Sequence, residues 1–378
     1  MDQKSFEQFE TLCNAVFGNL GTGNTLEARE MLESICLHPS FVEKAESLCL
    51  VGFSCRTVFD NSKNIYALHC AGTSLIKLMT DYWNNYDNDQ KLRIRFVSSL
   101  VSRLGDFILQ YLIKNGSELP PHITTTLCTL ICRITSLSWM TDTRQRNILE
   151  LMLQYTKSRD NCIIALTILE ELVAQMVPKS TTIHPPLPPE TSNTQQNKAA
   201  IQFRDSNLLN VALLALNMLR DTFQADDATV GSAQLRNDLY DKSLKLLNRC
   251  FSYDCRASKI EDGLESHPTL GIPSDWLNRF LSSENLNLLF SMWGCGGWMM
   301  DSYERAEAPI TTEIVEAVLW MICCSRTDLF SSSLETDVFS TLLQHLLNVL
   351  NSGHGLDDSD TVHAFCQLLD RFKVGVVM

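Results

Sequence analysis

The sequence lacks the short cysteine and histidine spacings that hold metal ions. It contains 14 cysteines and 8 histidines, yet it has no Cys-X-X-Cys pair and no His-Glu-X-X-His motif. Metal sites built from these residue types usually need such spacings, so we expect no metal and no cofactor. Cysteines such as Cys70, Cys128 and Cys162 lie in apolar helical patterns and are predicted to be reduced core thiols.

The sequence also lacks a long hydrophobic run. The most apolar stretch, Leu208–Leu219, is too short for a membrane span and contains Asn210 and Asn217, so it predicts a buried helix. The first ten residues carry charges and have neither a secretory nor a transit pattern. We expect no membrane insertion and a location in the cytoplasm or nucleus.

The sequence contains fewer basic than acidic residues. The 31 lysines and arginines are outnumbered by 44 aspartates and glutamates, which gives a formal charge of -13. Such a chain repels phosphate backbones and attracts basic protein surfaces, so direct nucleic-acid binding is not expected. No nucleophile elbow, kinase signature or paired-carboxylate motif occurs, and the run Gly294–Gly297 lacks the lysine of a phosphate loop. The protein is predicted not to be an enzyme.

Apolar residues at spacings of three and four are abundant and predict pairs of amphipathic helices. The predicted pairs are Phe6–Leu20 with Thr25–Ile35, Phe41–Val51 with Ile65–Trp83, Ile94–Tyr111 with Leu127–Leu137, Thr143–Tyr155 with Asn161–Val177, and Leu208–Met218 with Leu235–Phe251. The first four begin near residues 6, 40, 87 and 141, which is too irregular for a fixed repeat but typical of HEAT-like units. An elongated, all-α HEAT-repeat solenoid of antiparallel helix pairs is predicted.

The chain is predicted to have two parts joined by a proline-rich loop. Residues 1–177 form the first part, and residues 178–197 form the loop, in which Pro178–Gln196 cannot be helical. Residues 198–378 form the second part, with a polar loop at Arg256–Gly271 and shorter helices at Trp276–Leu281, Asn285–Trp293, Thr312–Cys324, Leu334–Leu350 and Thr361–Phe372. The apolar ending Val374–Met378 predicts an uncapped, truncated solenoid, because a terminal repeat normally has a polar outer face.

Several short motifs, in order along the chain, resemble the exportin-seven family of nuclear transport receptors, relatives of importin-beta. They include Leu75–Leu78, Ile134–Trp139, Cys162–Leu169, Phe203–Ser206, Cys250–Asp254, Ile272–Trp276 and Arg326–Phe330. Two departures are the replacement of the family's acidic loop by Arg256–Gly271 and the presence of Leu277 where arginine is expected. Family members are about three times longer, so the resemblance concerns an N-terminal portion.

The resemblance implies that the first repeats bind the GTP form of the small GTPase Ran through their inner helices, and that cargo lies along the arch. It also implies contact with nuclear pore proteins and a distribution over cytoplasm, nucleus and pore. Two alternatives remain: a generic HEAT-repeat scaffold that shares the periodicity, and a truncated isoform without transport activity.

Candidate Ran-binding residues are those on the side of each second helix opposite its buried stripe. On Ile65–Trp83 they are Tyr66, Thr73, Lys77 and Asp81; on Ile123–Ser138 they are Thr125, Thr129, Arg133 and Ser136; on the next such helix they are Thr167, Glu170 and Glu171.

Overall fold

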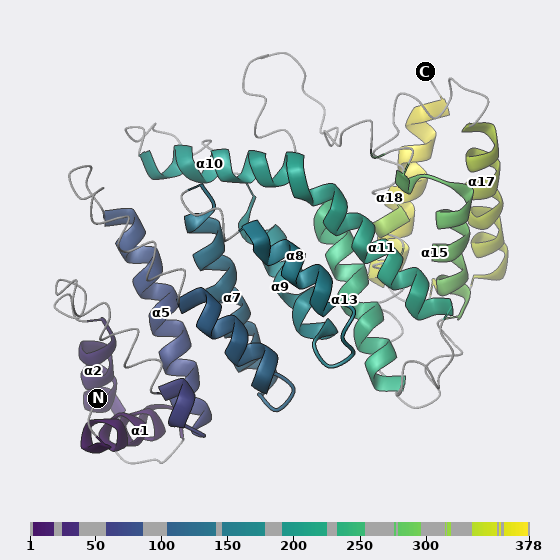
Figure 1. The fold of residues 1–378 in the computed structure, drawn as a ribbon. Helices are drawn as coiled ribbons and strands as arrows, with labels where there is room; N and C mark the ends of the chain where they lie inside the picture. The colour runs from purple at the N-terminus through teal and green to yellow at the C-terminus, as the bar shows by residue number, and fades with distance from the viewer. Residues whose placement is uncertain are drawn as a thin grey trace. The chain divides into compact units, whose positions relative to one another are not determined.

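The computed structural model describes most of the helical segments expected from the sequence. It covers residues 3–18, 25–37, 58–85, 104–140, 146–177, 191–224, 233–253, 276, 279–295, 314, 316–318, 335–353, 355–356 and 359–376. Within these ranges the chain consists of helices joined by turns and contains no strand (Figure 1). The predicted all-α fold is confirmed.

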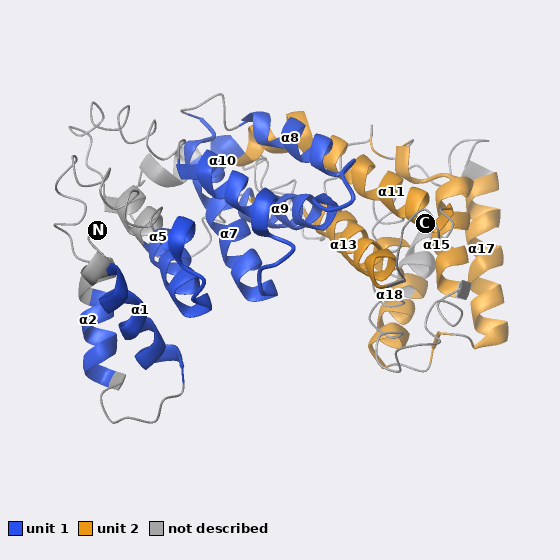
Figure 2. Ribbon diagram, turned by 60° about the horizontal axis from the view of Figure 1, so that its bottom comes forward, with its two compact units in different colours: residues 1–176, 184–199 blue, residues 177–183, 200–378 orange. Residues whose placement is uncertain are grey.

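The chain divides into two compact units, coloured separately in Figure 2. The first comprises residues 1–176 and 184–199, and the second comprises residues 177–183 and 200–378.

The first unit is a succession of packed helices. They are α1 (Gln3–Phe17), α2 (Thr25–Leu37), α5 (Ile65–Asn85), α7 (Pro121–Ser138), α8 (Ile148–Tyr155) and α9 (Cys162–Gln175), with a further helix at residues 104–115. The main contacts join α1 to α2, α1 and α2 to α5, α5 to α7, α7 to α9, and α8 to α9. α5, α7 and α9 alternate with other helices along the chain and pack on one another in succession, as in a HEAT-like solenoid.

The core of this unit lies between α7 and α9. On α7 the fully buried residues Leu127, Leu130 and Ile134 recur at spacings of three and four, and α9 contributes Ile168 and Leu172 from its facing side. Each such side chain contributes roughly 1.5–3 kcal/mol of transfer free energy when it is buried. The apolar residues that recur along the sequence of each helix therefore form the contacts between α7 and α9.

One glycine allows a particularly close approach in this unit. Gly116 follows the helix at residues 104–115, and its backbone amide donates to the carbonyl oxygen of Leu112. A Cβ atom added at Gly116 would clash with the Cδ1 atom of Ile164 on α9 and with the carbonyl oxygen of Leu112. The absence of a side chain therefore lets Ile164 pack against this turn.

The second unit begins within a long helix that is locally underwound. α10 (Thr191–Phe203) continues through a π-helical turn, η3 (Arg204–Leu208), into α11 (Leu209–Gln224). α11 packs on α13 (Ala233–Phe251), and α15 (Ser283–Cys295) packs on α17 (Glu335–Ser352). α18 (Ser359–Val376) reaches α15 through Phe365, whose ring lies 5.8 Å from that of Trp293.

The predicted loop at 178–197 is partly wrong. The chain is helical from Thr191 onward, so Thr191–Gln196 belongs to α10. The prolines that forbid a helix end at Pro189, and the polar residues after it can still form helical hydrogen bonds. The last helix, predicted at Thr361–Phe372, is longer at both ends than expected.

Some predicted segments lie outside the described residues. They are Phe41–Val51, residues 94–103, residues 178–190, Arg256–Gly271, Gly296–Gly297, most of Thr312–Cys324, and Val377–Met378.

Candidate partner-binding surface

α5 presents three of its four candidate residues to solvent. Ala71 and Leu75 are buried on one side of the helix, whereas Tyr66, Thr73 and Lys77 are exposed on the other. Tyr66 retains 40% of its accessible surface although its ring stacks on Phe17 at 6.1 Å. Asp81 belongs to α5, but its side chain lies outside the described residues.

α7 presents a narrower polar strip than its sequence suggests. Thr125 is exposed, and Thr129 and Arg133 are half-buried. Burial lowers the pKa of the Arg133 guanidinium, which nevertheless stays charged at neutral pH because arginine starts from so high a value. The polar strip of α7 thus contains one positively charged side chain, Arg133, together with two threonines.

The expected exposure of Ser136 is wrong. All residues from Ile134 to Trp139 are buried, so this end of α7 is enclosed on every side. The Ser136 Oγ donates a hydrogen bond to the carbonyl oxygen of Arg133 at 3.0 Å, which satisfies the buried hydroxyl within its own helix. Periodicity alone could not show that the surrounding chain covers the polar side of α7 here.

Three of the four candidate threonines share one arrangement of their hydroxyl groups. Thr73, Thr125 and Thr167 donate to the carbonyl oxygens four residues earlier, at 2.9, 2.9 and 2.8 Å respectively. Because each hydroxyl hydrogen is used inside the helix, these side chains offer a partner a methyl group and an acceptor oxygen.

α7 and α9 are joined at the candidate surface by a residue that the sequence interpretation missed. The Nε2 atom of Gln175 donates to the carbonyl oxygen of Thr129 at 3.2 Å and to Oε1 of Glu171 at 2.8 Å. Glu171 and Gln175 are four residues apart on α9, a spacing that places two side chains together on a helix. The spacing of four residues between Glu171 and Gln175 was the feature of the sequence from which this contact could have been predicted.

The thiol of Cys132 confirms how closely α9 approaches α7. Its Sγ donates to the carbonyl oxygen of Ile168 at 3.2 Å. Burial raises the pKa of the Cys132 thiol well above its ordinary value, with smaller contributions from Cys128 and from Glu171. The Glu171 carboxylate is therefore close enough to α7 to act on groups of that helix.

α5 and α7 come together at Gly72, which the sequence interpretation also missed. A Cβ atom at this position would lie 2.9 Å from the Cγ2 atom of Thr126. The absence of a side chain lets α7 lie close to α5, so that Thr73 and Thr125 belong to neighbouring helices in contact. The candidate residues of α5, α7 and α9 consequently lie on three successively packed helices.

A row of rings runs from α1 over α5 to α7. Phe17 contacts both Tyr66 and His69 at 6.1 Å between ring centroids, and His69 lies 5.8 Å from His122. Burial lowers the pKa of His69, and the neighbouring His122 lowers it further. Both effects favour the neutral imidazole in the folded chain.

The motifs that carry the family resemblance lie mainly in the core. Phe203, Phe251 and Trp276 are buried, and the Tyr253 hydroxyl donates to the carbonyl oxygen of Ala200 at 3.0 Å. Arg204 pairs with Asp205 at 2.7 Å within the π-helical turn. Residues 272–275 and Arg326–Phe330 lie outside the described residues. These motifs therefore maintain the fold more than they form a surface.

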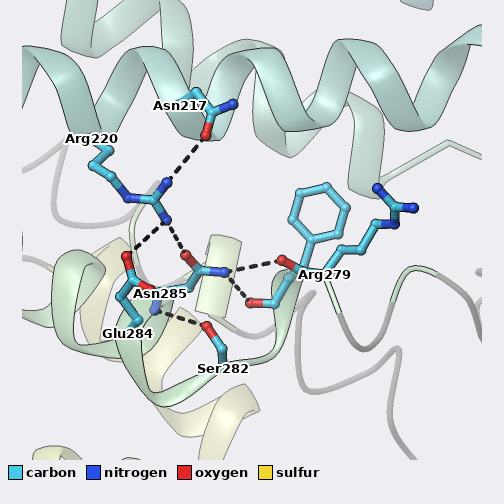
Figure 3. Close-up of polar contacts among 7 residues, drawn as sticks. Asn217, Arg220, Arg279, Ser282, Glu284 and Asn285 are labelled. Carbon is cyan, nitrogen blue, oxygen red and sulfur yellow. Dashed lines mark hydrogen bonds and ion pairs between the residues drawn. The ribbon is translucent and has the colours of Figure 1, made fainter.

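A polar network in the second unit fixes the start of α15 to α11 (Figure 3). The buried Asn285 donates through Nδ2 to the carbonyl oxygens of Arg279 at 3.2 Å and Phe280 at 2.8 Å. Its Oδ1 accepts from Arg220 of α11 at 2.8 Å, and Arg220 also lies 3.5 Å from Glu284. This cluster joins α11 to the start of α15 through hydrogen bonds and one ion pair.

The described part of the chain contains no group of three or more histidine, cysteine, aspartate or glutamate side chains that could hold a metal ion. Among the described helices, none is long and apolar enough to cross a membrane.

The fold and this surface define a protein of HEAT-like helix pairs with a mixed polar strip over α5, α7 and α9. A comparison with known protein families finds no match. Comparisons with curated proteins find Exportin-7-B of Xenopus laevis, 25% identical over 375 residues, which are 98% of this chain and 31% of that protein. Ran-binding protein 17 of Homo sapiens is 24% identical over 375 residues, covering 98% of this chain and 30% of the relative.

A third relative, Ran-binding protein 16 of Drosophila melanogaster, is 23% identical over 372 residues. The chain spans about 30% of the length of these relatives. The matches confirm the resemblance to the exportin-seven family that the sequence motifs indicated, and the similarity extends over nearly the whole chain. The relatives bear the names of transport and Ran-binding proteins, not of enzymes.

Proposed function

We propose that this chain is part of a nuclear transport receptor that binds GTP-bound Ran through α5, α7 and α9. The observation that carries the proposal is the similarity along 98% of the chain to an exportin and to Ran-binding proteins. The physical features are compatible with it, because the three helices are packed in order and expose Tyr66, Thr73, Lys77 and Thr125.

The charges of the surface suit a protein partner of mixed polarity. Lys77 and Arg133 supply cations, Glu170 and Glu171 supply carboxylates, and the remaining chain is strongly acidic with a formal charge of -13. Such a surface favours a partner with complementary basic patches. Protein cargo and nuclear pore proteins complete the proposed set of partners, with a distribution over cytoplasm, nucleus and nuclear pore.

Binding to immobilised Ran in its two nucleotide states tests the proposal. We expect GTP-bound Ran to retain the chain and GDP-bound Ran to retain much less. The combined substitution of Lys77→Glu and Arg133→Gln removes both cations of the strip and is expected to lower retention while leaving the helical content unchanged. Glutamine is used at Arg133 because that side chain is half-buried and an introduced carboxylate would cost folding free energy.

A matched control is available in the turn between α8 and α9. Lys157 and Arg159 are exposed there, outside the three helices. Lys157→Glu with Arg159→Gln makes the same change of charge and should leave retention unchanged. Equal retention of the chain by both nucleotide states would instead favour a generic HEAT-repeat scaffold.

A further inference from the structure

α9 is an apolar helix that keeps two carboxylates near its middle. Its sequence from Cys162 to Gln175 contains no charged residue other than Glu170 and Glu171, and eight of its side chains are buried. Glu170 and Glu171 are half-buried, so the polar side of α9 is partly open to solvent where they lie. The contacts of Glu171 must therefore account for where its carboxylate is held on that side.

The side chain of Gln175 supplies part of that account. Both of its hydrogen bonds are donated by Nε2, one to Oε1 of Glu171 at 2.8 Å and one to the backbone carbonyl of Thr129 at 3.2 Å. Its own Oε1 is buried and accepts no hydrogen bond from the described residues. The amide orientation is thus determined by the two acceptors, which lie on different helices.

This bridge ties the carboxylate to the α7 backbone. The Thr129 carbonyl belongs to the main chain of α7 and cannot move without that helix, so Gln175 restrains Glu171 relative to α7. After burial and the neighbouring Cys128, the Glu171 carboxylate also contributes to the raised pKa of the Cys132 thiol on the same helix. A restrained carboxylate loses less conformational entropy on meeting a cation than a freely rotating one.

We propose that Gln175 is a positioning residue that holds the Glu171 carboxylate at the junction of α7 and α9, where it receives a lysine or arginine side chain of the protein partner. This inference rests on the proposed function, and the partner is GTP-bound Ran. Gln175 itself does not contact the partner and acts through Glu171.

A double-mutant cycle tests the proposal with the complete chain. Gln175→Met keeps the length and volume of the side chain but removes both N–H donors, and Glu171→Gln removes the charge. Each single change is expected to weaken the binding of GTP-bound Ran by about fivefold, within the range of coupling between contacting residues. The double substitution should weaken binding no further than Glu171→Gln alone, because Gln175 has nothing left to position.

If Gln175 had a structural role alone, the two substitutions would weaken Ran binding independently of each other. The melting temperature of each variant is measured alongside, and Gln154→Met on α8, at an exposed position, serves as the matched control and should leave binding unchanged. Independent effects of the two substitutions on Ran binding would overturn the positioning role, as would unchanged binding by Gln175→Met.

A second measurement separates this inference from the proposed function. The side-chain amide signals of Gln175 in a nuclear magnetic resonance spectrum should shift on Glu171→Gln without any Ran present, because one of the two hydrogen bonds is altered. Unshifted signals would overturn the bridge itself. If the signals shift but the unchanged chain does not prefer GTP-bound Ran, the proposed function fails, and the assignment of Ran's basic side chain fails with it.

Discussion

The reactivity of individual cysteines follows from their burial. Cys366 on α18 is exposed, whereas Cys162 and Cys250 are buried. Burial raises the pKa of Cys162 to about 11 and that of Cys250 further still, so little thiolate is present on either at neutral pH. We expect iodoacetamide to alkylate Cys366 long before these two, as followed by peptide mass spectrometry at intervals. Early alkylation of Cys250 in the folded chain would contradict its position in the core.

A second residue-scale prediction concerns pH. The pKa of His69 is lowered in the folded chain, so below its ordinary value of 6.5 the unfolded chain binds the proton more readily. The folded state should therefore lose stability as pH falls below about 6.5, until the folded-state pKa is also passed. His69→Phe, which retains a ring beside Phe17, should flatten this decline in denaturation midpoints measured at several pH values.

A decline that persists in full in the His69→Phe variant would assign it to other groups.

The burial or exposure of a residue was predictable from the sequence where the apolar periodicity of its own helix determined it. On α5, Leu68 and Leu75 of the predicted apolar stripe are buried and the opposite side is exposed at Thr73 and Lys77. Ile65, at the start of the same predicted stripe, is exposed instead. Ser136 was not predictable, because its burial depends on chain from outside α7 that covers its polar side. Gln175 and Gly72 act through contacts between helices, which a single-helix pattern does not encode.

At the scale of elements, the junction of α11 and α15 depends on one buried amide. Asn285→Ala would remove one of the hydrogen-bond partners of Arg220 and leave the carbonyl oxygens of Arg279 and Phe280 without their Nδ2 donor. Leaving buried polar groups unpaired costs about 1–3 kcal/mol. We expect Asn285→Ala to lower the unfolding free energy by that amount and to increase hydrogen exchange at the start of α15.

The adjacent Glu284 provides the comparison for Asn285. Its carboxylate is 77% exposed and lies 3.5 Å from Arg220, so the ion pair is screened by solvent. Glu284→Gln should change the denaturation midpoint very little. A large loss there, with a small loss for Asn285→Ala, would mean that the ion pair and not the amide holds the junction.

Helices were predictable in number and place where apolar spacing extended over several turns, as in α7, α9, α11 and α13. The beginning of α10 was not, because Thr191–Gln196 is polar and follows a proline-rich stretch. The π-helical turn at Arg204–Leu208 was also missed, since one additional residue per turn leaves no mark on a hydrophobic pattern of this length. Arg204, Asp205 and Ser206 of the Phe203–Ser206 motif lie in this turn, and Phe203 ends the helix before it.

At the scale of the whole molecule, the acidic composition gives a prediction about the rate of partner binding. A formal charge of -13 creates a long-range field that attracts basic protein surfaces during diffusional encounter. At about 0.15 M ionic strength the Debye length falls to about 8 Å, and most of that attraction is screened. We expect the association rate with GTP-bound Ran to fall as salt rises, with a smaller change in the dissociation rate, in stopped-flow or surface-based kinetics.

Glu170→Gln with Glu171→Gln should reduce this salt dependence more than the same change at the exposed Glu27 and Glu30 of α2, because only the first pair lies on the proposed surface. An association rate independent of salt, or equal effects of the two pairs, would show that attraction to the α7 and α9 region does not guide the encounter.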